Sequence, residues 1–125
     1  MSINNYTIIK VDTIESTMTN NKEMIKQFIS LYLTQSRVDF QAIKTAIDKK
    51  DHAEISSKAH HIKPTMEYIG ASDLRIKFQE LETLGKQKAE ITVISEIFTK
   101  LEKTFEILLQ ELNSYYEHIN SPHAD

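Results

Sequence analysis

The chain has 125 residues, the length expected for one domain with a single packed core. Its formal net charge of −3 argues against a nucleic-acid-binding protein, since such proteins present a basic face, and its lack of cysteine excludes disulfides, thiol catalysis and zinc–thiolate sites. Two glycines, two prolines and an abundance of Ile, Leu, Lys and Glu favour an all-α chain.

The first part of the chain predicts an arm, a brief helix and a long helix. Residues 1–11 should form an arm that lies on the bundle through Tyr6, Ile8, Ile9 and Val11. Asp12 followed by Glu15 predicts the cap of a short helix that ends near residue 18. Asn20 with Glu23 predicts the start of the long helix. Its apolar stripe continues, past a bend near Ser36, through Val38, Phe40, Ile43, Ala46 and Ile47.

The second part predicts three further helices. Asp51 with Glu54 starts one that Gly70 ends, and the next turns Leu74, Phe78 and Leu81 inward and stops near Gly85. The last runs over about residues 90–119, with a nearly heptad stripe of Ile94, Ile97, Leu101, Phe105, Leu108, Leu112, Tyr115 and Ile119. Short connections make neighbouring helices antiparallel.

We therefore predict an all-α, antiparallel up-down four-helix bundle with a short extra N-terminal helix. One domain should cover residues 1–125: the arm and short helix over 1–18, the bundle over about 19–119, and a tail over 120–125.

The third of these five helices carries an outward histidine beside a lysine. Its buried stripe is formed by Ile55, Ala59, Ile62, Met66 and Ile69. At about 100° per residue, His60 lies roughly 140° from that stripe, and Lys63 follows on the same side. An imidazole held in water on a rigid helix can accept a phosphoryl group, and the ammonium offsets its negative charge. The plainer alternative is an ordinary surface histidine.

His61 fits the acceptor role less well. Its spacing to Lys63 is two residues, which places the two side chains about 200° apart around the helix. We interpret it as a solvated neighbour. Consecutive helical residues point about 100° apart and cannot bind one ion, so the pair predicts no metal site.

The pattern Ala-His-x-Ile-Lys at residues 59–63, with Gly70 ten residues after His60, resembles the histidine-containing phosphotransfer (HPt) domain of multistep two-component relays. The resemblance covers roughly residues 12–119. It implies that His60 is the phosphorylated residue, that Lys63 is its charge partner and that Gly70 closes the helix. Phe78, Leu81 and Glu82 resemble the apolar-Leu-Glu pattern that the family carries in the following helix.

One position departs from the family pattern. The residue four after the histidine is usually glycine and here it is Pro64. A compact proline leaves room for a partner's loops. It removes the hydrogen-bond donor for the carbonyl of His60, which predicts a local bend in the helix.

The resemblance also implies a phosphorelay intermediate rather than an enzyme with ATP-dependent kinase activity, and the sequence has no Gly-rich phosphate loop. By this resemblance, a receiver aspartate should pass the phosphoryl group to His60, which should pass it to the aspartate of another receiver. We expect the chain itself to need no cofactor, because the resemblance implies that the receiver supplies Mg²⁺. The expected partners are response-regulator receiver domains and a hybrid histidine kinase, with the chain itself monomeric.

We expect the receiver to dock on the histidine helix and on the helix that follows it. Ser56, Pro64 and Glu67 lie within about 60° of His60 around the helix axis. Ile76 lies roughly opposite the buried stripe of the next helix.

The residues leave a second class of function open, a non-catalytic helical interaction or adaptor module that binds a signalling partner. A His-based hydrolase is disfavoured, because no Ser, Cys or Asp arrangement accompanies His60 in the motif. No apolar run is long enough to cross a bilayer, and the polar start lacks the apolar segment of a signal peptide. We expect a cytoplasmic protein with no membrane partner, and Met1 favours a free-standing one.

Overall fold

The computed structural model describes residues 6–120, and the remaining parts of the predicted arm and tail, 1–5 and 121–125, lie outside it. The described residues form five helices and no strand: α1 (Val11–Thr17), α2 (Lys22–Asp48), α3 (His52–Tyr68), α4 (Ser72–Lys86) and α5 (Ile91–Asn120). The predicted all-α bundle with a short N-terminal helix is confirmed. None of these helices is long and apolar enough to span a membrane.

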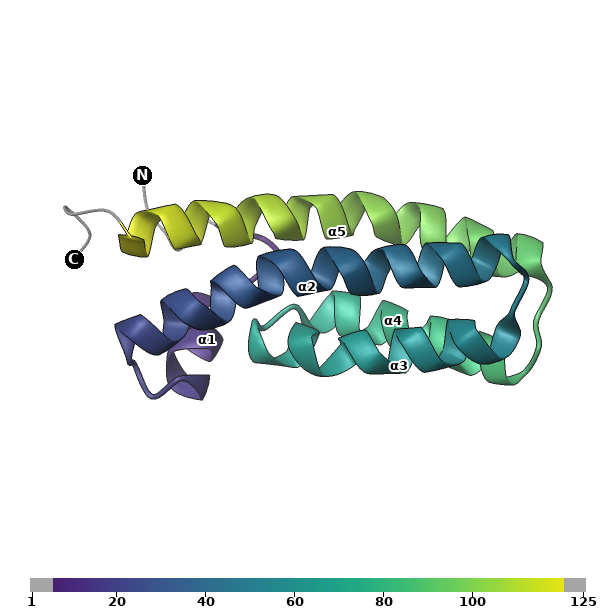
Figure 1. The fold of residues 1–125 in the computed structure, drawn as a ribbon, viewed down its shortest axis with the longest axis horizontal. Helices are drawn as coiled ribbons and strands as arrows, with labels where there is room; N and C mark the ends of the chain where they lie inside the picture. The colour runs from purple at the N-terminus through teal and green to yellow at the C-terminus, as the bar shows by residue number, and fades with distance from the viewer. Residues whose placement is uncertain (1–5, 121–125) are drawn as a thin grey trace.

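Helices α2 to α5 alternate in direction, as predicted for an up-down bundle (Figure 1). Each packs against its neighbours in the order α2, α3, α4, α5, and α5 returns to α2. Helices α2 and α5 extend beyond the shorter pair α3 and α4, and α1 lies beneath the start of α2 at that end (Figure 1). Helix α3 therefore lies along one side of the bundle, with α2 and α4 on its flanks.

Aromatic rings from three helices meet in the centre of the core. Phe40 of α2 stacks on Phe105 of α5, with ring centroids 4.2 Å apart, and on Phe98, with centroids 4.7 Å apart. Phe78 of α4 packs edge-on against Phe40 and Phe105. The predicted stripe of α5 is buried except for Ile97, which is only partly covered. These contacts hold α2, α4 and α5 in a fixed register.

Two predicted helix starts are displaced by one or two residues. Helix α2 is capped by Asn21, whose side chain accepts a hydrogen bond from the amide of Met24, and not by Asn20. Asn20 instead adopts φ 58° in the turn before the helix, a left-handed conformation that asparagine tolerates. Helix α1 has Lys10 at its N-cap without a side-chain cap bond, and Asp12 lies in its first turn. Helix α2 continues without interruption through Ser36.

Both ends of α3 are fixed by local interactions. The side chain of Asp51 accepts a hydrogen bond from the amide of Glu54 at 3.1 Å, as predicted. Gly70 follows the helix with φ 75°, a conformation that costs glycine little. A Cβ at Gly70 would lie 2.6 Å from the Cβ of Lys10, so the arm also requires glycine there.

The arm joins α5 to the end of α3. The carboxylate of Glu111 on α5 accepts hydrogen bonds from the three backbone amides of residues 7–9, at 2.8 to 3.0 Å. The amide of Lys10 then donates to the carbonyl of Ile69 at 2.9 Å. The predicted packing of the arm on the bundle is confirmed for residues 6–11, since Ile9 and Val11 are buried.

Replacing Glu111 should release the arm. We expect Glu111→Ala to lower the free energy of unfolding by about 1–3 kcal/mol, because three backbone amides lose their common acceptor. Urea denaturation followed by circular dichroism measures the change. The matched control is Glu106→Ala, an exposed glutamate on the same helix, which should change stability by less than about 0.5 kcal/mol. Equal losses in the two variants would contradict the role given to Glu111.

Candidate functional site

His60 stands in the middle of α3 and faces outward, as its helical phase predicted. Its side chain is 70% exposed, and Ile55, Ala59 and Ile62 on the other side of the helix are fully buried. The Nδ1 atom of His60 lies 3.2 Å from Oε1 of Glu82 on α4. Its Nε2 atom has no hydrogen-bond partner within residues 6–120. One ring nitrogen is thus held by a carboxylate, and the other is left unbonded on a largely exposed ring.

Glu82 is the centre of the polar cluster around this ring. Its side chain is only 6% exposed. Its Oε1 accepts a hydrogen bond from Nζ of Lys63 at 2.6 Å, and its Oε2 accepts one from Nζ of Lys86 at 3.1 Å. Burial raises the pKa of Glu82, but the hydrogen bonds from Lys63, Lys86 and His60 outweigh burial and lower it from 4.5 to about 2. Glu82 is therefore a carboxylate at neutral pH and can only accept hydrogen bonds.

Lys63 is held more tightly than the sequence indicated. Its side chain is 14% exposed, and its ammonium donates to Gln79 of α4 as well as to Glu82. His60 and Lys63 thus share one carboxylate oxygen, which keeps the lysine within reach of the ring. Its role as charge partner of a phosphoryl group stays a prediction.

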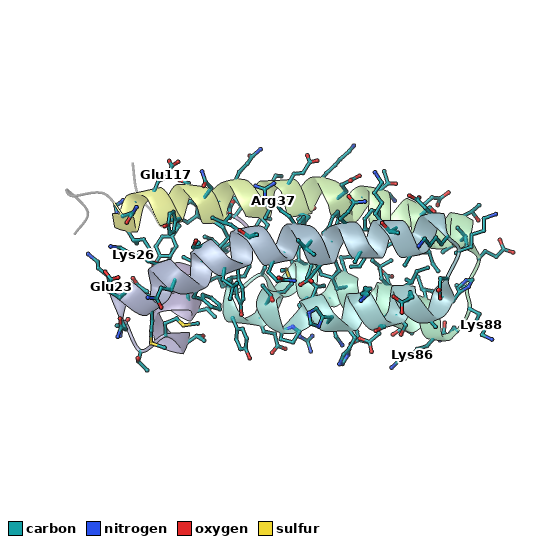
Figure 2. All side chains as sticks on the ribbon, in the orientation of Figure 1. Glu23, Lys26, Arg37, Lys86, Lys88 and Glu117 are labelled. Atoms are coloured by element: carbon teal, nitrogen blue, oxygen red, sulfur yellow. The ribbon has the colours of Figure 1, made fainter. Side chains whose placement is uncertain are left out.

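Gln79 and Lys86 also belong to this polar cluster, although no motif in the sequence pointed to them. Together with Glu82 they recur at spacings of three and four on α4, so they form one face of that helix. Lys86 projects from the side of the bundle formed by α3 and α4 (Figure 2), and its side chain is 68% exposed. Two lysines against one carboxylate leave an excess of one positive charge beside His60. The polar face of the helix that follows the histidine helix is the sequence pattern from which Gln79 and Lys86 could have been predicted.

A glycine brings α3 and α4 close enough for these contacts. A Cβ at Gly85 would lie 2.9 Å from both the carbonyl oxygen of His52 and the amide nitrogen of Ser56, so the two backbones nearly touch there. Ser56 is consequently buried, with 8% of its surface exposed. The prediction that Ser56 lies on a docking surface is therefore wrong, because α4 covers the side of α3 on which it lies.

His61 leans toward α2 and away from Glu82. Its side chain is 67% exposed, as predicted for a solvated neighbour, and its Nε2 lies 3.8 Å from Oδ1 of Asp39. Asp39 is buried on α2 and accepts a hydrogen bond from Gln35 at 3.0 Å. The two adjacent histidines therefore face different carboxylates on opposite sides of α3. Residues 6–120 contain no cluster of three potential ligands that could hold a metal ion.

The remaining residues proposed for docking are exposed. Pro64 lies on the surface within an uninterrupted α3, Glu67 pairs with Arg75 of α4, and Ile76 is 58% exposed. The bend expected at Pro64 and the docking roles stay predictions.

Exposed apolar side chains also occur on α2, which packs against α3, and at the end of α3 itself. Leu31 and Val38 on α2 are 60% and 57% exposed, and Tyr68 at the end of α3 is 43% exposed. The assignment of Val38 to the buried stripe is wrong, because its side chain is largely exposed. Both helices that pack on the histidine helix, α2 and α4, thus carry exposed aliphatic side chains.

A known protein family matches the part of the chain that carries this histidine. A family model described as Hpt domain matches residues 27–117, which include all of α3 and α4. The match covers more than two thirds of the 125 residues. No curated protein and no solved structure showed a significant match.

The lowered pKa of Glu82 makes part of the stability dependent on pH. Because the pKa is about 2 in the folded state against an ordinary value of 4.5, this stabilisation is present above pH 4.5 and is lost as the pH falls toward 2. We expect the difference in free energy of unfolding between wild type and Glu82→Gln to shrink over that interval by on the order of 3 kcal/mol.

Urea titrations at a series of pH values measure this difference. The matched control is Glu80→Gln, an exposed residue on the same helix, whose difference from wild type should vary little with pH. A constant difference for Glu82→Gln from pH 6 to pH 2 would show that its carboxylate is not stabilised by these neighbours.

Proposed function

The chain belongs to the Hpt domain family, and on that premise we propose that His60 accepts a phosphoryl group from the aspartate of one receiver domain and passes it to the aspartate of another. The family consists of phosphocarrier modules of two-component signalling, which work with response regulators and kinases. The receiver-to-receiver direction and the identity of the acceptor are our proposal. Upstream, a hybrid histidine kinase would supply the phosphoryl group through its own receiver.

The observation that carries this proposal is the contact between Nδ1 of His60 and the carboxylate of Glu82. An ionised carboxylate accepts hydrogen bonds and cannot donate them, so Nδ1 is the nitrogen that carries the proton. The lone pair of the neutral ring is then on Nε2, which faces outward. A neutral imidazole with this tautomer is a nucleophile that needs no further deprotonation.

The transfer step requires only that Nε2 be placed in line with the leaving aspartate. The Nε2–P bond forms while the bond between phosphorus and the aspartate oxygen breaks, and the carboxylate leaves. The charges on Lys63 and Lys86 favour the arriving negative charge. We propose that the Mg²⁺ that such a transfer uses is held by the receiver. The contribution of this chain is a rigid helix that presents a nucleophile at fixed geometry.

We propose that the receiver seats across α3 and touches both of its flanks. Val38 on α2 and Ile76 on α4 are exposed aliphatic side chains of the two helices that pack on the histidine helix. Protein interfaces commonly place apolar contacts inside a polar rim, and the rim here includes His61, Pro64 and Glu67. This surface is wider than the one expected from the sequence, since it includes α2.

The acceptor is tested with two adjacent histidines. We expect His60→Gln to abolish transfer of radiolabelled phosphate from a phosphorylated receiver, because the substitution removes the proposed acceptor nitrogen beside Glu82. His61→Gln is the matched control and should retain most of the transfer, since His61 faces Asp39. The label should be acid-labile and alkali-stable. A receiver that binds tightly yet labels neither protein would favour the adaptor alternative, and label retained in His60→Gln would move the acceptor elsewhere.

The docking surface is tested with matched aliphatic residues. We expect Val38→Asp to slow transfer from the receiver by about tenfold, because a charge would be buried in the interface, and a tenfold change corresponds to about 1.4 kcal/mol. Ile107→Asp places the same charge at an exposed position of α5, which does not adjoin α3, and should leave the rate unchanged. Stopped-flow or gel-based transfer rates measure the effect. Similar rates in both variants would exclude the α2 flank from the interface.

A further inference from the structure

The carboxylate that holds Nδ1 of His60 is itself fixed in place. Oε1 of Glu82 is bound by Lys63 and Oε2 by Lys86, and the side chain is 6% exposed. It has little freedom to turn away from the histidine, whatever group the ring carries. The 3.2 Å contact between Nδ1 and Oε1 is therefore available to the phosphorylated ring as well as to the free one.

Phosphorylation of Nε2 determines which protonation states are possible at Nδ1. Once Nε2 is bonded to phosphorus, Nδ1 carries either a proton or a lone pair. If it carries a proton, cleavage of the N–P bond releases neutral imidazole, a good leaving group. If it carries a lone pair, the same cleavage would have to release an imidazolate anion, which is far less favourable. Whether Nδ1 is protonated thus sets how readily the phosphoryl group leaves Nε2.

We propose that Glu82 keeps the proton on Nδ1 after Nε2 has been phosphorylated, and that it thereby makes the phosphoryl group on His60 labile. A lone pair on Nδ1 would face a carboxylate oxygen at 3.2 Å, which is repulsive, whereas an N–H donates a charge-assisted hydrogen bond to it. The inference rests on the proposed role of His60 as the acceptor and names the residue that regulates its lability.

The proton balance of the whole cycle supports this role. When His60 accepts the phosphoryl group, the Nε2–P bond forms, the aspartate carboxylate leaves, and Nδ1 keeps its proton. When His60 gives it up, an aspartate oxygen bonds to phosphorus, the N–P electron pair returns to Nε2, and Nδ1 again keeps its proton. No proton moves in either direction, so the ring returns directly to its nucleophilic tautomer.

The other charged groups around the ring act against protonation or face elsewhere. Lys63 on α3 and Lys86 on α4 are cations, and they disfavour a further positive charge on the ring of His60. His61 adjoins the ring on α3, and Asp39 on α2 faces His61. Helix α5 packs on α2 and α4. Glu67, further along α3, pairs with Arg75. Among the described residues, Glu82 is therefore the carboxylate that contacts Nδ1 and favours its proton.

The test uses the full chain labelled with ¹⁵N-histidine and phosphorylated chemically by potassium phosphoramidate, with His60 identified by peptide mapping. Nitrogen NMR follows protonation of Nδ1 in phosphorylated His60 as a function of pH, and loss of label is measured in parallel. We expect Glu82→Gln to lower the midpoint of Nδ1 protonation by about one pH unit. Near pH 8 the label should then be lost up to roughly tenfold more slowly than in wild type.

Lys86→Gln is the control, because it removes a neighbour of the same carboxylate but leaves the carboxylate in place. Lys86→Gln should leave the midpoint of Nδ1 protonation unchanged or raise it. An unchanged midpoint in Glu82→Gln overturns the inference, and so does a lowered midpoint in both variants, which a general disturbance of the site would produce. A change in decay rate that is uniform across pH also overturns it, since it would reflect net charge and not the proton on Nδ1.

A comparison with the unfolded protein covers the case in which the variant does not fold, and the labelling method separates this inference from the proposed function. If Glu82→Gln does not fold, as judged by circular dichroism, the wild-type midpoint is compared with that of the same protein in concentrated urea. A higher midpoint in the folded state supports the inference and an equal one overturns it. Chemical labelling does not use a receiver, so a receiver that fails to phosphorylate His60 would count against the proposed function alone.

Discussion

The close backbone contact between α3 and α4 at Gly85 is the constraint on which the functional face depends. A side chain at Gly85 would collide with the backbone of α3 at His52 and Ser56, so the two helices could not approach as they do. Glu82 lies one turn before Gly85 on α4, so this close approach sets the register in which Glu82 reaches the ring of His60. A bundle of the same helices spaced further apart would leave the ring of His60 without its carboxylate partner and therefore without a defined tautomer.

Charge at the site is arranged around a single buried carboxylate. An isolated carboxylate at this depth would favour its neutral form, but two ammonium groups and a ring nitrogen hold it ionised. The same contacts hold Lys63 and Lys86 on the carboxylate that lies beside the ring of His60, so in the proposed function their charges are in place before transfer. Preorganised charge of this kind avoids the cost of rearranging the site during transfer.

The far end of α3 is stabilised by a part of the chain outside the bundle. The arm binds α5 through Glu111 and reaches the end of α3 through the backbone of Lys10 and Ile69. Gly70 has the left-handed conformation that this junction requires. Since the proposed transfer depends mainly on position, the elements that fix both ends of α3 would contribute to it without contacting the phosphoryl group.

The sequence by itself determined the helices, the outward phase of His60 and the acceptor motif, because helical periodicity at 3.6 residues per turn is a local property. The phase of one helix does not say which neighbour covers each side, so Ser56 was misplaced on the surface and Val38 in the core. The contact between His60 and Glu82 joins residues 22 positions apart and depends on the packing register of two helices. Only the tertiary structure decided that register, because it arises from side chains such as Phe40 and from the space left by Gly85.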